Sequence, residues 1–205
     1  LRSRGLGDVY KRQIVDISKP GDPCSGAEAL IRWNSEAMGM ISPSEFIPLA
    51  EYLGLINPIG SFALKEACHR CKYWNDMGHP EYHVNVNLSV VQLLQNDMKE
   101  KVREVLEETK MDPANLTLEV TESLAINDMK RMKKILSDIK SLGVKVALDD
   151  FGTGYSSLNH IRELPIDIIK IDRCFIIDIG KDEYAEAFVT VSYTHLRAHE
   201  TGAYL

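Results

Sequence analysis

The fold is decided by residues 144–158, which read VKVALDDFGTGYSSL. The apolar run Val144–Leu148 has the length and the β-branched content of a buried strand. It ends in two adjacent carboxylates, Asp149 and Asp150, and a glycine-rich turn follows. Two serines, which are common helix caps, then open a helical pattern. The stretch therefore predicts a strand, a tight turn and a helix, the unit from which parallel sheets and barrels are built.

Similar units lie on both sides of this stretch. Further strands are predicted at His83–Val86, Leu116–Val120 and Ile168–Ile171. Amphipathic helices are predicted at Val90–Thr109, Asn127–Leu142 and Ser156–Leu164. Because strand starts recur about every 24–33 residues, the pattern predicts an α/β domain whose parallel sheet is either open or closed as a barrel.

The N-terminal half adds a strand and two helices. Ala27–Trp33 predicts the strand. Residues 42–45, SPSE, form a capping box with proline at the first helical position, ahead of a helix over Phe46–Leu53. A longer helix follows from Asn57 to about Asn75. No internal repeat is visible, so one α/β domain is the simplest interpretation.

Composition narrows the class of protein. The chain has 205 residues, 44% of them hydrophobic, and a net charge of −6. The acidic balance argues against a nucleic-acid partner or contact with an anionic membrane. No apolar run approaches the roughly 20 residues of a membrane span. The four cysteines are irregularly spaced, which favours a reducing compartment over a disulfide framework, and we expect a cytoplasmic domain.

The two ends share a property of their coding DNA. Residues 8–13, DVYKRQ, can be encoded by GATGTGTATAAGAGACAG, and the reverse complement of that DNA encodes VSYTH, the sequence of residues 191–195. Such an inverted repeat resembles a transposon end used in preparing sequencing libraries. We therefore predict that residues 1–13 and 191–205 are non-native adaptor read-through. The two segments carry net charges of +3 and 0, so the predicted domain, residues 14–190, carries −9.

Polar side chains recur at the predicted strand ends. They are Glu28, Asn87, Glu119, Glu122, Asp149, Asp150 and Lys170. Taken singly, each acidic residue could cap a helix or meet solvent, and Lys170 could be a surface lysine. Five strands that all carry such groups instead favour a site for Mg²⁺ or Mn²⁺, which prefer carboxylate and amide oxygens. The Gly152-Thr153-Gly154 turn fits either a phosphate cradle or a tight turn.

With these residues in order, the chain resembles the EAL family of cyclic di-GMP phosphodiesterases. Glu28-Ala29-Leu30 with Arg32 matches the ExLxR motif behind the family's name. The family's other motifs follow in order as Asn87-Leu88-Ser89, residues 118–122 (LEVTE), residues 149–158 (DDFGTGYSSL) and Ile169-Lys170-Ile171-Asp172. Five ordered motifs across residues 26–173 make the resemblance specific.

The resemblance implies a TIM-like (β/α)₈ barrel whose first strand runs antiparallel, here truncated so that the last two strands are missing. It also implies two metal ions, Mg²⁺ or Mn²⁺. The first would be held by Glu28, Asn87, Glu119 and Asp149, and the second by Asp150 together with Asp149. A further ligand of the second metal, a glutamate in a Gly-Val-Glu segment, is expected to be lost by truncation after Val189.

The resemblance also implies roles for the remaining residues. Lys170 would contact the nucleophilic water or the scissile phosphate, so the predicted catalytic residues are Lys170, Asp150 and Glu28. Arg32 would bind a substrate phosphate, and Leu30 would line the guanine pocket. Glu122 would anchor the Asp149–Leu158 loop, which links metal occupancy to homodimer formation in the family.

The predicted function is metal-dependent hydrolysis of cyclic di-GMP to linear pGpG, in bacterial second-messenger signalling. The alternative is a non-catalytic receptor of the same fold that binds cyclic di-GMP. Because each of the five metal ligands that the chain reaches is intact, the enzyme is favoured. The chain as written is expected to be an impaired fragment, whose parent protein carries upstream sensory, GGDEF or membrane-anchoring domains.

Overall fold

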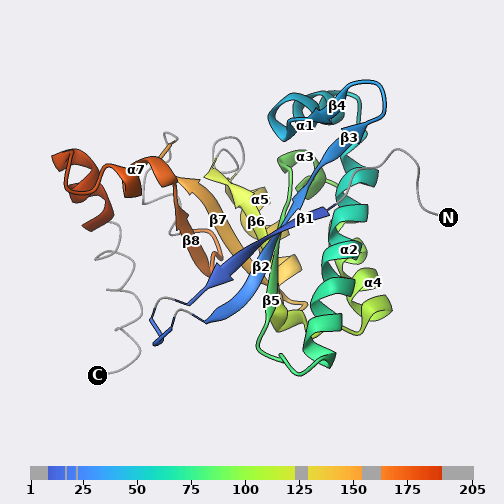
Figure 1. Cartoon of the computed structure of the whole chain (residues 1–205). Coiled ribbons are helices and arrows are strands. Elements are labelled where there is room, and N and C mark those ends of the chain that lie inside the picture. Colours follow the sequence, from blue (N-terminus) through green and yellow to red (C-terminus); the bar gives the residue numbers. More distant parts are fainter. Residues whose placement is uncertain (1–8, 17, 22, 123–128, 154–162, 191–205) are drawn as a thin grey trace.

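The computed structural model describes residues 9–16, 18–21, 23–122, 129–153 and 163–190 (Figure 1). Its main sheet holds six strands of the described chain in the order β1-β2-β5-β6-β7-β8, and β3 and β4 form a separate hairpin. The strands are β1 (Val9–Val15), β2 (Cys24–Ile31), β3 (Trp33–Ser35), β4 (Gly39–Ile41), β5 (His83–Asn87), β6 (Leu116–Thr121), β7 (Lys145–Phe151) and β8 (Ile168–Ile171). Only β1 is antiparallel to its neighbour in the main sheet, as predicted for the first strand.

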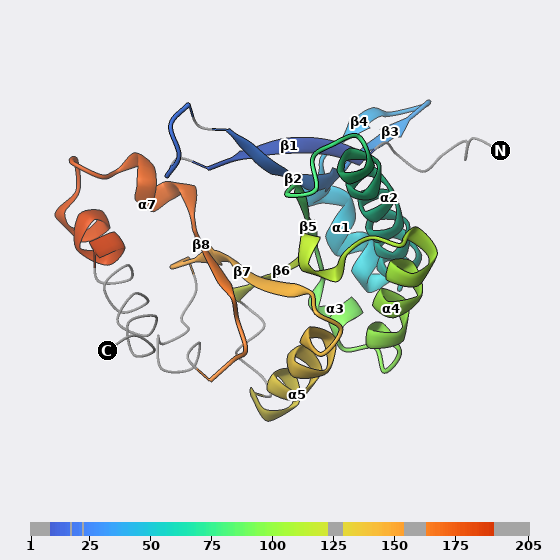
Figure 2. The ribbon, with the colours of Figure 1, turned by 90° about the horizontal axis from the view of Figure 1, so that it is seen from below.

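Helices α2 (Ile56–Asp76), α4 (Met98–Thr109) and α5 (Met129–Lys140) lie on the outer, convex side of this curved sheet (Figure 2). Helix α1 (Pro43–Tyr52) lies beside the β3–β4 hairpin at one end of the molecule (Figure 1). The short α3 (Val90–Leu93) follows β5, and the short α7 (Arg173–Ile177) follows β8. The capping box predicted at the start of α1 is present, with the Glu45 carboxylate accepting from Ser42 N at 3.3 Å. Within the described part of the chain, no helix has both the length and the apolar composition that crossing a membrane requires.

One predicted helix is wrong in its extent. The pattern over Val90–Thr109 gives two helices, α3 and α4, with a break at residues 94–97. Leu93 and Met98 flank the break, and both are buried in the core. In a continuous helix these two side chains would point about 140° apart, so one would face solvent. The break lets both side chains reach the core. The predicted helix over Ser156–Leu164 falls largely outside the described residues.

Strand β1 includes residues that the sequence predicts to be foreign to the domain. Val9 pairs with Ile31 at one end of the β1–β2 ladder, and Val15 pairs with Cys24 at the other. The guanidinium Nη1 of Arg12 lies 3.6 Å from a carboxylate oxygen of Glu28. The hydrogen bonds between paired strands join backbone groups, so residues with many different side chains can form this pairing. The foreign origin of residues 1–13 therefore stays a prediction.

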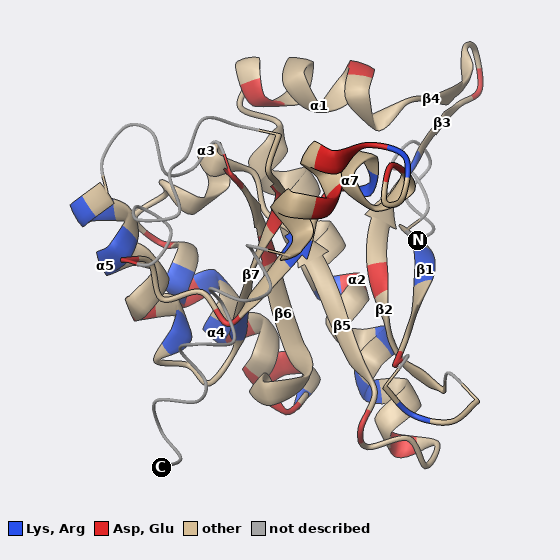
Figure 3. Cartoon of the chain, turned by 90° about the vertical axis from the view of Figure 1, so that its left-hand side faces the viewer, with Lys and Arg blue, Asp and Glu red and all other residues tan. Residues whose placement is uncertain are grey.

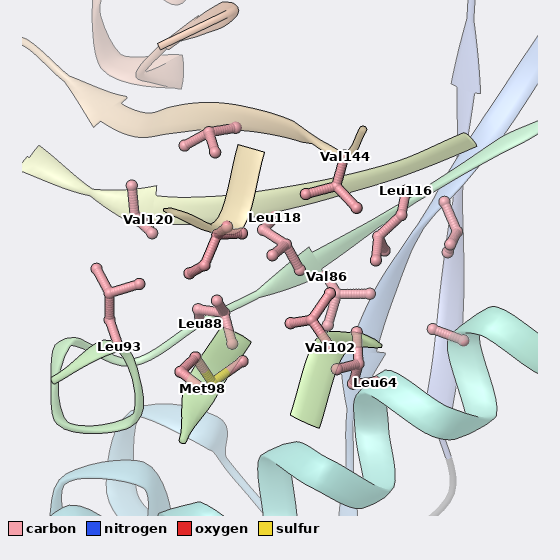
Figure 4. Packing of buried hydrophobic residues seen from close by; sticks show 14 of the residues in the cluster. Leu64, Val86, Leu88, Leu93, Met98, Val102, Leu116, Leu118, Val120 and Val144 are labelled. Atoms are coloured by element: carbon pink, nitrogen blue, oxygen red, sulfur yellow. The ribbon is translucent and has the colours of Figure 1, made fainter. Parts of the chain in front are cut away.

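The hydrophobic core lies between the sheet and the helices (Figure 4). Leu118 and Val120 of β6 are buried against Leu64 of α2, Val102 of α4 and their neighbours. Because side chains alternate along a strand, the positions between them face the inside of the curve. The buried polar residue Glu119 occupies one of these inner positions. The outer face thus supplies the apolar core, and the inner face is left to polar groups.

Candidate metal and substrate site

Three carboxylates converge on the inner face of the sheet. They belong to Glu28 of β2, Glu119 of β6 and Asp149 of β7, and ligand atoms from all three lie within 4.8 Å of one another. Oxygens on opposite sides of one divalent ion are about 4–5 Å apart, so this spacing fits a cation. Asp149 is in register with Thr121, two residues beyond Glu119 on the neighbouring strand. The parallel pairing therefore places both carboxylates on the same face.

Two further predicted site residues join this carboxylate cluster. Asn87 Nδ2 donates a hydrogen bond to Glu28 Oε1 at 3.0 Å. Lys170 Nζ lies 2.7 Å from Glu119 Oε2, 2.9 Å from Asp149 Oδ2 and 3.9 Å from Glu28 Oε1. The structure thus brings together Glu28, Asn87, Glu119, Asp149 and Lys170, from five different strands.

Two side chains of the carboxylate cluster have raised pKa values. Burial raises the pKa of Glu119, although the Lys170 ammonium and a hydrogen bond from Asn85 oppose the rise. Burial alone would lower the pKa of Lys170, but its hydrogen bonds to Asp149 and Glu119 outweigh burial and raise it. The lysine is therefore charged at neutral pH and neutralises part of the cluster. Figure 3 shows acidic segments on β2 and around α7, while basic segments lie along α5.

Asp150 lies beside the cluster rather than within it. The β7–β8 register shifts between Leu148 and Phe151, so Asp150 occupies an irregularity of the kind that re-aims side chains near active sites. Its backbone has a positive φ of 55°, which is uncommon for a residue other than glycine. Burial and the nearby Asp149 raise the pKa of its carboxyl. Its predicted place at a second metal stays a prediction.

Glu122 contacts the loop that it was predicted to anchor. Its side chain is buried, and its Oε2 accepts a hydrogen bond from the backbone N–H of Gly152 at 3.0 Å. A Cβ added at Gly152 would lie 2.5 Å from ring atoms of Phe175 and Phe188, and φ there is +102°. Glycine is therefore required at this contact. Residues 154–162 of the loop, and the dimer contact predicted for it, lie outside the described residues.

A cavity of about 600 Å³ opens next to the carboxylate cluster. Glu28 and Asn87 line it, as do both predicted substrate-binding residues, Leu30 and Arg32. Its other walls come from α1, α2 and α3 and are mostly apolar. A concave, mainly apolar space with a few polar groups at one end is typical of a small-molecule site.

Two residues of this site were missed as functional candidates. Asn85 Nδ2 donates to Glu119 Oε1 at 2.7 Å, and Glu51 lines the cavity. The sequence held a signal for Asn85, because strand alternation places it on the same face as Asn87. The sequence held no such signal for Glu51, because this residue lies on a helix far from every strand-end motif.

The fold and site together define an α/β barrel domain with an acidic site built from the inner face of its strands. The chain belongs to the EAL domain family, whose sequence profile matches residues 14–202. The match begins at the predicted start of the domain and extends beyond residue 190.

Curated relatives carry names that concern cyclic di-GMP. The chain is 40% identical over 187 residues to the bifunctional diguanylate cyclase/cyclic di-GMP phosphodiesterase MucR of Pseudomonas aeruginosa, which is 89% of this chain and 27% of that protein. It is 36% identical over 180 residues to cyclic di-GMP phosphodiesterase NbdA of the same species, with coverages of 85% and 23%. The chain thus spans roughly a fifth to a third of the length of the curated relatives it matches.

Solved structures confirm the predicted TIM-like barrel fold. The PaMucR phosphodiesterase in complex with c-di-GMP has a TM-score of 0.83 and 40% identity, covering 92% of this chain and 75% of that one. The EAL enzyme Bd1971 in its cAMP-bound form has a TM-score of 0.84 and 28% identity, covering 94% and 54%. The FimX EAL domain, at 19% identity and a TM-score of 0.81, supports the fold alone.

Proposed function

We propose that the chain is the catalytic domain of a phosphodiesterase that hydrolyses cyclic di-GMP to linear pGpG with Mg²⁺ or Mn²⁺. The observation that carries the proposal is the convergence of Glu28, Glu119 and Asp149 beside a ligand-sized cavity. The relative at 40% identity is named as a cyclic di-GMP phosphodiesterase and has been solved with that dinucleotide.

The donor set fits a divalent cation. Glu28, Asn87, Glu119 and Asp149 offer hard oxygen ligands, and Asp150 would serve a second ion together with Asp149. The buried Glu119 carboxylate is unfavourable unless a positive charge lies near it. When bound, two such ions would supply the charge that stabilises the attacking and leaving oxygens of a phosphodiester and would acidify water.

The chain's own residues would position the substrate. Lys170 holds a proton at Nζ at neutral pH, within reach of the space that Asp149 and Glu119 border, so it can donate to a phosphate oxygen or orient a water molecule. Arg32 borders the cavity close to Glu28 and would bind the second phosphate. Leu30 contributes an apolar surface for a base.

The loop after Asp150 is the part of the domain to which we assign regulation. Glu122 fixes the start of this loop through Gly152, two residues after the acidic pair. We propose that a homodimer forms through this loop. We also propose that the loop couples metal occupancy to dimer formation. A cytoplasmic location of the domain belongs to the same proposal.

The test is turnover by the full chain. Purified protein is incubated with cyclic di-GMP and Mn²⁺, and the products are separated by chromatography. Conversion to pGpG that stops when EDTA is added supports the proposal. Binding of cyclic di-GMP with no turnover at any metal concentration would fit either the receptor alternative or the impaired fragment that the sequence predicts, and turnover by the longer parent protein separates these two outcomes. Absence of binding would contradict both functions.

A further inference from the structure

Two buried polar side chains lie side by side on the inner face of the sheet, next to the carboxylate cluster. Thr117 of β6 and Asn85 of β5 are in register on neighbouring parallel strands, so their side chains point to the same face. Glu119 follows Thr117 by two residues and shares this face. Thr117 is 1% exposed and Asn85 is 7% exposed. Both side chains are thus shielded from bulk solvent beside a proposed metal ligand.

Each of these two side chains has an oxygen that no hydrogen-bonding group of the described residues reaches. The two atoms are Asn85 Oδ1 and Thr117 Oγ1. The great majority of buried side-chain polar atoms in folded proteins pair with a protein group or with ordered water. The amide of Asn85 donates from Nδ2 to Glu119 Oε1 at 2.7 Å, so its carbonyl oxygen still requires a donor. Asn85 and Thr117 therefore share a need for one more polar partner.

The neighbouring inner position on β7 carries a small side chain. Ala147 is in register with Glu119 and therefore lies on the inner face as well. It is fully buried, but unlike its neighbours Val146 and Leu148 it does not belong to the apolar core cluster. Its methyl group offers no hydrogen bond to either oxygen and fills less of this face than the branched side chains that are common inside barrels. A partner for the two oxygens is therefore a small polar molecule near Thr117.

A water molecule meets the needs of both atoms. The carbonyl oxygen of Asn85 can only accept, whereas the hydroxyl of Thr117 can donate and accept. One water can donate to Asn85 Oδ1 and still form a second hydrogen bond with Thr117 Oγ1. A cation would be a poorer partner, because Lys170 Nζ already lies 2.7 Å from Glu119 Oε2. The chemistry of the two oxygens and the adjacent charge thus favour a neutral molecule.

We propose that a buried water molecule bridges Asn85 Oδ1 and Thr117 Oγ1, and that Thr117 is thereby a positioning residue for the metal ligand Glu119. This inference rests on the proposed function, because it concerns the metal site of that function. The bridge holds the amide of Asn85 with its carbonyl toward the water and its Nδ2 toward Glu119. A reversed amide would set two acceptor oxygens against each other and lose the hydrogen bond that orients the carboxylate.

The experiment compares Thr117→Val and Thr117→Ser with wild type in the full chain. Valine has nearly the shape of threonine but lacks the hydroxyl, whereas serine keeps it. Mn²⁺ affinity is measured by titration calorimetry, and a crystal structure of the metal-free wild type tests for the water directly. The matched control is Thr109→Val, because Thr109 is also buried but its hydroxyl donates to Val105 O within α4, at 2.7 Å.

We expect Thr117→Val to weaken Mn²⁺ binding by about 10-fold, the lower end of the range for partners outside the ligand shell, because it acts on the ligand through Asn85. Thr117→Ser and Thr109→Val should bind Mn²⁺ like wild type. When Asn85 is already replaced by alanine, Thr117→Val should cause no further loss, because the two residues act in series. The metal-free crystal structure should hold a water within hydrogen-bond distance of both oxygens.

Equal Mn²⁺ affinity in Thr117→Val and wild type would overturn the positioning role and leave the proposed function standing. An equal loss in Thr117→Val and Thr109→Val would overturn it as well, because a general loss of stability would then explain both. A crystal structure in which Thr117 Oγ1 bonds Asn85 Oδ1 directly, without a water, would overturn the bridge. A wild-type chain that binds no Mn²⁺ would instead contradict the proposed function and, with it, this inference.

Discussion

Asn85 donates a hydrogen bond from Nδ2 to Oε1 of Glu119, across 2.7 Å between the neighbouring strands β5 and β6. Both side chains are buried, and Lys170 lies 2.7 Å from the other oxygen of the same carboxylate. One oxygen of Glu119 is thus oriented by a neutral amide, and the other faces a cation. Asn85 accordingly sets the direction in which this carboxylate presents its second oxygen.

Asn85→Ala should therefore weaken metal binding without removing a ligand. The loss of an outer-shell partner typically costs about 10- to 100-fold in metal affinity, because the ligand loses its orientation. Titration of Mn²⁺ by calorimetry measures the effect. Asn34→Ala, which changes an exposed asparagine in the β3–β4 hairpin, is the control. Equal Mn²⁺ affinity in Asn85→Ala and wild type would show that the hydrogen bond has no such role.

Lys170→Met should destabilise the metal-free protein and make it more responsive to metal. Removing the ammonium leaves the carboxylates of Glu119 and Asp149 without their cation, and leaving a buried polar group without its partner costs roughly 1–3 kcal/mol. Added Mn²⁺ supplies the missing charge, so it should raise the melting temperature of the variant more than that of wild type. Lys134→Met, which breaks an exposed ion pair with Asp138, should cost less than about 1 kcal/mol. A Lys170→Met protein as stable as wild type in EDTA would count against the account.

The same lysine gives a pH dependence with a definite sign. Its pKa in the folded state lies above the ordinary value of 10.5, so its ion pairs stabilise the fold fully below that pH. The stabilisation is lost as the pH rises through the raised pKa. The difference in unfolding free energy between wild type and Lys170→Met should therefore be constant between about pH 7 and pH 9 and shrink above about pH 10.5. Urea unfolding across this range measures it, and a difference that grows with alkaline pH would contradict the assignment.

Gly152→Ala should destabilise the loop that Glu122 anchors. Any residue with a Cβ pays roughly 1–2 kcal/mol at a positive φ. At Gly152 the added carbon would also approach Phe175 and Phe188 to 2.5 Å, at a further cost of about 1–3 kcal/mol. Gly180→Ala is the matched control, because φ there is +78° and nothing lies within 4 Å of the added carbon. Urea unfolding that gives equal losses for the two variants would refute the packing argument.

The sequence predicted β5, β6, β7 and β8 because strands of this kind follow from short-range patterns. The predicted strand Ala27–Trp33 is wrong in its extent, because β2 ends at Ile31 and Trp33 begins β3 in a separate hairpin. β8 has the predicted bounds, and the start of β6 agrees while its end lies one residue further. Strand alternation and parallel pairing then bring Glu119 and Asp149 to one face with no further information. The convergence of these carboxylates was predictable for this reason.

The remaining features depend on contacts distant in the sequence. The break between α3 and α4 depends on which side chains pack in the core. Helical periodicity alone did not predict this break. Glu51 is joined to Ser89 across 38 residues, and neither residue lies at a predicted strand end. The position of Asp150 depends on a register shift between β7 and β8, which a propensity argument cannot locate.

The central claim is that the carboxylate cluster is the divalent-metal site, and the Mn²⁺ dissociation constant of Glu28→Gln tests it most directly. Glutamine keeps the carbonyl that accepts from Asn87, so the fold should be retained, but one charged ligand is lost. We predict that Mn²⁺ affinity falls by more than the roughly 10- to 100-fold typical of an outer-shell change. Glu36→Gln, at an exposed position, should bind Mn²⁺ like wild type. A Glu28→Gln protein that binds Mn²⁺ as tightly as wild type would contradict the account.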